Sequence, residues 1–119
     1  MFLFIYEGDN DIAGGEKPAA IAKEARQLIQ RIKKDLPQTR IILNSAKPSV
    51  ARWNFREQYL DLNKRLQKLA MEEGIEIADV WSAMVDEKGE VYTDIFIEDN
   101  LHMNKKGYDI WGTVMREYL

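Results

Sequence analysis

The chain contains no cysteine, only three prolines and a single histidine among its 119 residues. Without cysteine it cannot form a disulfide, a thiolate metal site or a thiol nucleophile. It has no excess of positive charge either, because 17 Lys and Arg stand against 20 Asp and Glu, so the basic surface of a nucleic-acid-binding protein is not expected. No apolar run approaches the roughly 20 residues of a membrane span.

The longest apolar run at the start of the chain, Met1 to Tyr6, has no cationic residue before it and is too short for the core of a signal peptide. We therefore expect a cytoplasmic protein. A length of 119 residues fits one domain, residues 1–119.

Short apolar runs alternate with amphipathic helical patterns along the chain. The runs predict buried strands at 1–6, 40–45 and 75–80, the last being the least regular. Apolar residues at spacings of three and four predict helices over 18–35, from the region after Pro48 to about Glu73, and from about Asn104 onward. The apolar stripe of the last helix is predicted to include Tyr108 and Trp111. This alternation is typical of an α/β fold with a parallel sheet.

Right-handed crossovers predict that the first two helices cover one face of this sheet and the last helix covers the other, which gives three layers, α/β/α. The strand over residues 1–6 would then be an exposed edge, although its composition suits burial on both faces. We therefore expect a domain truncated to about three strands and incomplete at its amino end, which associates through this edge, for example as a homo-oligomer.

Two polar stretches are candidates for a functional site. In the first, Asp99 precedes His102 by three residues, close enough to hold one ring nitrogen of the imidazole. An imidazole has an ordinary pKa of about 6.5 and works best as a base when a carboxylate fixes its tautomer. The second stretch is the predicted loop 7–15, which follows the first strand and carries Gly8-Asp9-Asn10-Asp11.

Together these stretches resemble the SGNH hydrolases, also called GDSL-type esterases and acylhydrolases. Residues 8–11 look like the family's Gly-x-Asn-Asp block. Residues 99–111, which read Asp-Asn-Leu-His-Met-Asn-Lys-Lys-Gly-Tyr-Asp-Ile-Trp, look like its Asp-x-x-His block. The resemblance implies a flavodoxin-like fold and an esterase, lipase or acylhydrolase that acts on a small-molecule ester without a cofactor. It also implies that Asn10 donates to the oxyanion hole, that His102 is the general base and that Asp99 orients it.

The chain departs from the family at the nucleophile. The Gly-Asp-Ser block is absent, and none of Ser45, Ser49 and Ser82 stands in its context. Ser45 ends the second strand, where we interpret it as a structural residue. The resemblance therefore covers the carboxyl-terminal part of an SGNH enzyme, and this chain alone is expected to be inactive.

Two other hypotheses remain open. The chain is a catalytically dead remnant that binds a partner through its exposed first strand, or Asp9, Asp11, Asp99 and His102 form a metal site. The second is disfavoured because Ala13 and Ala20 stand where a calcium loop needs oxygen ligands.

Two further residues follow the second strand. Arg52 and Trp53 have the position of pocket-lining residues, but tryptophan at a helix start usually packs on the core, and we leave both out of the predicted site.

Overall fold

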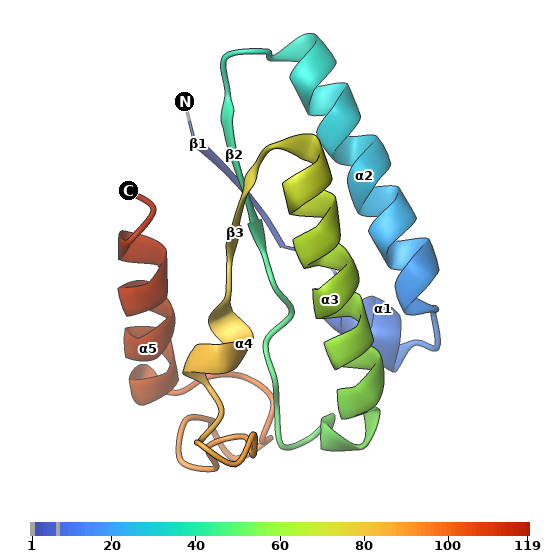
Figure 1. Ribbon diagram of the computed structural model, residues 1–119. Coiled ribbons are helices and arrows are strands. Elements are labelled where there is room, and N and C mark those ends of the chain that lie inside the picture. The colour runs from blue at the N-terminus through green and yellow to red at the C-terminus, as the bar shows by residue number, and fades with distance from the viewer. Residues whose placement is uncertain (1, 7) are drawn as a thin grey trace.

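The computed structural model describes residues 2–6 and 8–119, and it forms a parallel sheet of three strands (Figure 1). The strands are β1 (Phe2–Ile5), β2 (Arg40–Asn44) and β3 (Glu76–Ala78), in the order β1-β2-β3. Phe2 pairs with Arg40, and Ile42 pairs with Glu76. Met1 of the predicted first strand and Glu7 of the predicted loop lie outside the described residues.

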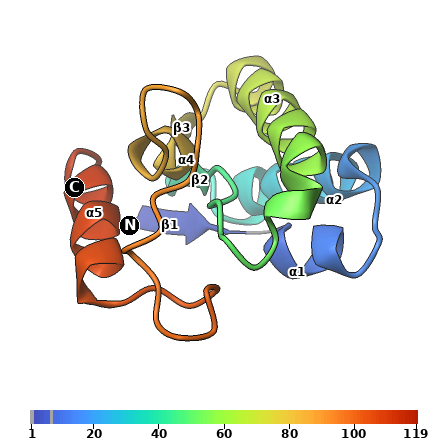
Figure 2. The same cartoon turned by 90° about the horizontal axis from the view of Figure 1, so that it is seen from below.

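Helices cover both faces of the sheet and confirm the three-layer α/β fold. The long helices α2 (Pro18–Asp35) and α3 (Arg56–Glu73) pack on one face, and α5 (Lys105–Arg116) lies on the other (Figures 1 and 2). Three short helices complete the chain: α1 (Asp9–Ala13), η1 (Trp53–Phe55) and α4 (Val80–Ala83). No helix in the described part of the chain is both long and apolar enough to cross a membrane.

The predicted helical stripes form the core between the sheet and the first helical layer. Ile21, Ala25 and Ile29 of α2 are buried against the same cluster as Tyr59, Leu62 and Leu66 of α3. Leu28 of α2 is 37% exposed, and Leu36, which follows the helix, is 48% exposed. The buried face of α2 is therefore narrower than its apolar pattern.

Two predicted boundaries are wrong for local reasons. Residues 9–13 of the predicted loop form α1, which begins after Gly8 turns the chain with a left-handed φ of 109°. The predicted strand 75–80 ends at Ala78, because Asp79 accepts the backbone N–H of Ser82 and starts α4. Both short helices lie at the carboxyl end of a strand.

β1 is an edge strand, as predicted, and it is less buried than its sequence suggests. Of Phe2, Leu3, Phe4 and Ile5 only Ile5 is buried, and Phe2 is 50% exposed. Its hydrogen-bonding partner in the described sheet is β2 alone. The prediction of burial on both faces is therefore wrong for most of this strand in the present structure.

One position of the stripe predicted for α5 is wrong, whereas Trp111 packs against a buried cluster as predicted. Tyr108, predicted to face the core, is 59% exposed, whereas Gly107 is buried. A Cβ atom built on Gly107 would lie 2.5 Å from the backbone oxygen of Ile95 and 2.9 Å from Cβ of Met103. The helix approaches the preceding loop so closely because this position has no side chain.

We therefore expect Gly107→Ala to destabilise the protein by about 1–3 kcal/mol, the usual cost of overpacking. Gly112→Ala is the matched control on the same helix, since its Cβ would meet only the flexible end of Arg116 at 3.5 Å. Alanine is the better helix former, so the control is expected to gain about 0.5–1 kcal/mol. Urea unfolding of both variants measures the difference, and equal stabilities would contradict this packing argument.

Candidate functional site

The loops that follow β1 and β2 meet the loop before α5 at the carboxyl edge of the sheet, at the lower end of Figure 1. Parallel α/β sheets bind their ligands at this edge. A cavity of about 420 Å³ opens there, and both Asn10 and His102 line it, although 92 positions separate them in the sequence. The structure thus brings together the two polar stretches that the sequence singled out.

Asp99 holds the imidazole of His102. Its Oδ2 atom lies 2.5 Å from Nδ1 of His102, and its Oδ1 atom accepts the backbone N–H groups of Leu101 and His102, each at 2.9 Å. The hydrogen bond to His102, followed by these backbone hydrogen bonds, lowers the pKa of Asp99 to about 2. Asp99 is therefore ionised at neutral pH and accepts a proton held on Nδ1, which leaves Nε2 as the basic nitrogen.

The turn that carries this pair is fixed by the backbone around it. Phe96 and Met103 form an isolated antiparallel bridge, and the N–H of Ile97 donates to the carbonyl of His102 over 2.9 Å. Asn100 takes a left-handed φ of 57°, which asparagine tolerates better than most residues. The side chain of His102 remains 71% exposed, so it is open to a ligand in the cavity.

Asn10 lies on α1 with an exposed side chain at the same cavity. Its Oδ1 atom accepts a hydrogen bond from Nη1 of Arg52 over 3.0 Å. Arg52 was left out of the predicted site, and that choice is wrong as far as the lining of the cavity is concerned. Its position after β2 was the available signal, because that loop ends at the same edge of the sheet as β1.

Asp9, considered from the sequence only as a metal ligand, is a buried carboxylate beside Asn10. Oδ1 of Asp9 lies 2.5 Å from the hydroxyl of Tyr59 and 2.8 Å from Nη1 of Arg52, and Oδ2 lies 3.6 Å from Nζ of Lys47. Burial alone would raise the pKa of Asp9, but the hydrogen bonds from Tyr59 and Arg52 and the charge of Lys47 lower it overall. Asp9 is therefore ionised and compensates two cations at the floor of the cavity.

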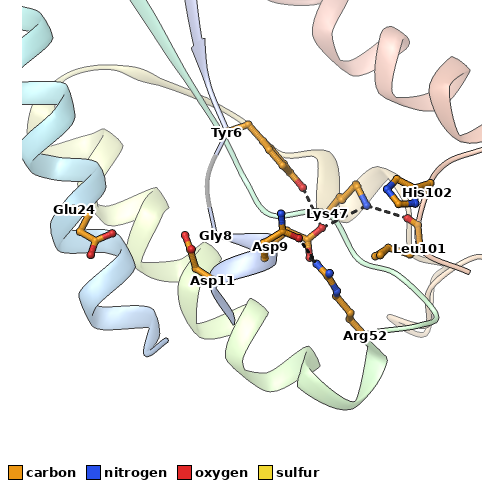
Figure 3. A pocket seen from close by; sticks show the side chains of 10 residues that line it. Tyr6, Gly8, Asp9, Asp11, Glu24, Lys47, Arg52, Leu101 and His102 are labelled. Carbon is orange, nitrogen blue, oxygen red and sulfur yellow. Dashed lines mark hydrogen bonds and ion pairs between the residues drawn. The ribbon is translucent and has the colours of Figure 1, made fainter. Parts of the chain in front are cut away.

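Lys47 links this buried carboxylate to the turn that carries His102. Its ammonium group donates to the carbonyl oxygen of Leu101 over 3.2 Å while facing Asp9 (Figure 3). Figure 3 shows Lys47 between Asp9 and His102, with Arg52 approaching Asp9 from the other side. The two sequence motifs are thus connected through side chains of the loop after β2.

None of the three serines, all within the described residues, lines this cavity. Ser45 is fully buried, and its Oγ atom accepts the backbone N–H groups of Val80 and Trp81 at 3.0 and 3.2 Å. Ser49 accepts the N–H of Arg52, and Ser82 donates to Asp79. Each hydroxyl has a structural partner, in agreement with the structural interpretation of Ser45.

Trp53 stacks on Trp81 with ring centroids 5.8 Å apart, which agrees with a packing role. The alternative metal site finds no support in the geometry. Asp9 faces Arg52 and Lys47, whose positive charges disfavour a metal ion. No group of three or more potential ligands is found together in residues 2–6 and 8–119.

Residues 2–110 match the GDSL-like Lipase/Acylhydrolase family. No curated protein matches the chain in sequence. Among solved structures, a protein from Streptococcus pneumonia superposes with a TM-score of 0.86 at 23% identity, covering 98% of this chain and 58% of that one. A GDSL-like lipase from Bacteroides thetaiotaomicron gives 0.82 at 20% identity, with coverages of 98% and 60%. The OSK domain of Drosophila Oskar gives 0.79 at 22% identity, with coverages of 99% and 61%.

At these identities the structural likeness shows a shared fold. The chain covers 58% to 61% of the length of these structures, about three fifths.

Proposed function

Since the chain belongs to the GDSL-like lipase/acylhydrolase family, we propose that it carries the base and one oxyanion donor of an ester or acyl hydrolase site. In this proposal His102 is the general base, Asp99 orients it, and Asn10 donates a side-chain N–H to the oxyanion. The substrate is a small-molecule ester that enters the cavity lined by Asn10 and His102.

The chemistry follows from the positions of these groups. A serine hydroxyl would attack the carbonyl carbon of the ester while Nε2 of His102 takes its proton. The carbonyl oxygen then carries negative charge, which the N–H of Asn10 would stabilise, and the ionised Asp99 would stabilise the imidazolium. When the intermediate collapses, the imidazolium returns the proton to the departing alcohol. Water then repeats the sequence on the acyl-enzyme.

The observation that carries the proposal is the shared cavity. An amide donor and a carboxylate-held imidazole, drawn from opposite ends of the chain, line one hollow at the carboxyl edge of a parallel sheet. No serine lines this hollow within the described residues, so the nucleophile would come from polypeptide outside residues 1–119. We therefore expect no ester turnover from residues 1–119 alone.

Hydrolysis of p-nitrophenyl acetate tests this division of roles. The assay compares residues 1–119 with a longer form that carries a nucleophilic serine on an added amino-terminal strand. The short form is expected to release p-nitrophenol no faster than an equal concentration of imidazole, and the longer form is expected to turn over. Rapid turnover by the short form that survives His102→Ala would contradict the proposal.

One observation favours a second candidate, an interaction module that binds through β1. This strand pairs only with β2 in the described sheet and exposes half of Phe2, and an open edge of this kind can pair with a strand of another chain. We expect residues 1–119 to self-associate and Phe2→Lys to reduce this association. Light scattering measures both masses, and a monomer at every concentration would count against this candidate.

A further inference from the structure

Arg52 contacts both the buried carboxylate and the amide of the site. Its Nη1 atom lies 2.8 Å from Oδ1 of Asp9 and 3.0 Å from Oδ1 of Asn10. We propose that Arg52, anchored by Asp9, is a positioning residue that turns the amide of Asn10 so that its NH₂ group is presented to the cavity. This inference rests on the proposed role of Asn10 as the oxyanion donor and explains how that role is achieved.

The chemistry of the two groups determines the orientation. A guanidinium group has N–H donors and no acceptor, whereas an asparagine amide has an oxygen that accepts and a nitrogen that donates. The atom of Asn10 that meets Arg52 must therefore be the oxygen, because the reverse orientation would place two sets of N–H groups against each other. The NH₂ group of Asn10 is then left for the cavity, where an oxyanion needs a donor.

Arg52 is itself held firmly. Its side chain is only 20% exposed and that of Asp9 11%, so their ion pair is largely shielded from water. The hydroxyl of Tyr59 holds the same oxygen of Asp9 at 2.5 Å, and Ser49 accepts the backbone N–H of Arg52 at 3.2 Å. Asp9, itself held by Tyr59, therefore anchors the guanidinium, and Ser49 fixes the backbone from which the Arg52 side chain extends.

The contact also changes the strength of the donor. A hydrogen bond from a charged group to the oxygen of an amide polarises the amide and makes its N–H groups better donors. Arg52 would thus orient Asn10 and strengthen it without touching the substrate. This combination accounts for a charged network directly behind an exposed asparagine.

A structural role of Arg52, limited to pairing with Asp9, makes a different prediction. In that case only the positive charge matters. Arg52→Lys, which keeps the charge but loses the planar guanidinium, would then leave the Asn10 amide ordered. An exposed control is available four residues away in Arg56, which stacks over Trp53 and donates to its carbonyl oxygen. Arg56→Met removes a positive charge from the same region without touching Asn10.

The test is NMR relaxation of the side-chain NH₂ group of Asn10, assigned by its disappearance in Asn10→Asp. We expect the NH₂ group of Asn10 to be ordered in the wild type and in Arg56→Met, and its order parameter to fall below about 0.6 in Arg52→Met and Arg52→Lys. The amide of Asn63, whose oxygen accepts the N–H of Ala46 at 2.7 Å, should stay rigid in every variant and shows that the fold persists. An ordered Asn10 amide in both Arg52 variants would overturn the inference.

The relaxation measurement needs neither a nucleophile nor turnover. Its result therefore tests the Arg52–Asn10 contact independently of the proposed function. In the longer form with the added nucleophilic serine, Arg52→Lys is expected to lower kcat by a larger factor than it changes KM. Combined with Asn10→Ala, it should add little to the loss that Asn10→Ala already causes. Independent, additive losses would contradict the positioning role. A mobile Asn10 amide combined with unchanged kcat would instead leave the contact standing and remove Asn10 from the proposed mechanism.

Discussion

Replacing His102 with alanine is expected to lower kcat for ester hydrolysis about 10⁶-fold in the longer form with the added nucleophilic serine. His102 is the only histidine in the chain, and no other imidazole can replace it as the base. A serine hydroxyl stays protonated near neutral pH unless a base takes its proton, so the covalent pathway closes with this substitution.

Asp99→Asn separates orientation from basicity. It leaves the imidazole in place but removes the charge that fixes Nδ1–H, and in a triad of this type the loss is about 10⁴-fold. The assay measures release of p-nitrophenol at saturating substrate, with circular dichroism as the control for folding. A loss of less than tenfold in His102→Ala would contradict the assignment of the base.

Replacing Asp9 with alanine is expected to destabilise the fold by about 3 kcal/mol, a large share of the stability of a small domain. The substitution leaves Arg52 and Lys47 without the carboxylate that compensates them, and their side chains are only 20% and 12% exposed. It also removes one of the two acceptors of the Tyr59 hydroxyl, the other being the backbone carbonyl oxygen of Asp9. Asp11→Ala, on the same helix α1, is the matched control and is expected to cost less than about 1 kcal/mol.

The effect of Asp9 should depend on pH in a defined direction. The folded state lowers the pKa of Asp9, so its contribution to stability is fully present above the unfolded pKa of about 3.9. It is lost as the pH falls through the lower, folded pKa. Urea unfolding from pH 7 to pH 2 should therefore show the gap between wild type and Asp9→Ala closing below about pH 4. A gap that stays constant over this range would contradict the account.

Periodic features of the sequence predicted the fold well. The i, i+3, i+4 spacing gave the bounds of α2, and the alternation of runs and helices gave the parallel sheet. Features that leave no periodic pattern in the sequence were missed. The five residues of α1 are too few to show a stripe, and the close approach at Gly107 depends on an absent side chain, which a search for apolar residues cannot find.

The site was predictable to the extent that it lies in short motifs. The sequence placed Asn10, Asp99 and His102 near one another, and their catalytic roles remain predictions. It could not show Asp9 as buried, because an aspartate in a polar loop normally faces water. The partners that compensate its charge, Lys47, Arg52 and Tyr59, lie 38 to 50 positions away and meet it only after the strands pair.

The tautomer of the neutral His102 ring, read from its two ¹⁵N chemical shifts, shows whether Asp99 prepares this imidazole as a base. If Asp99 holds Nδ1, the proton resides on Nδ1 and Nε2 carries the free lone pair that accepts a proton from the nucleophile. We expect the Nδ1–H tautomer in the wild type and a shift toward Nε2–H in Asp99→Ala. A wild-type ring protonated on Nε2, unchanged by Asp99→Ala, would contradict this role of Asp99.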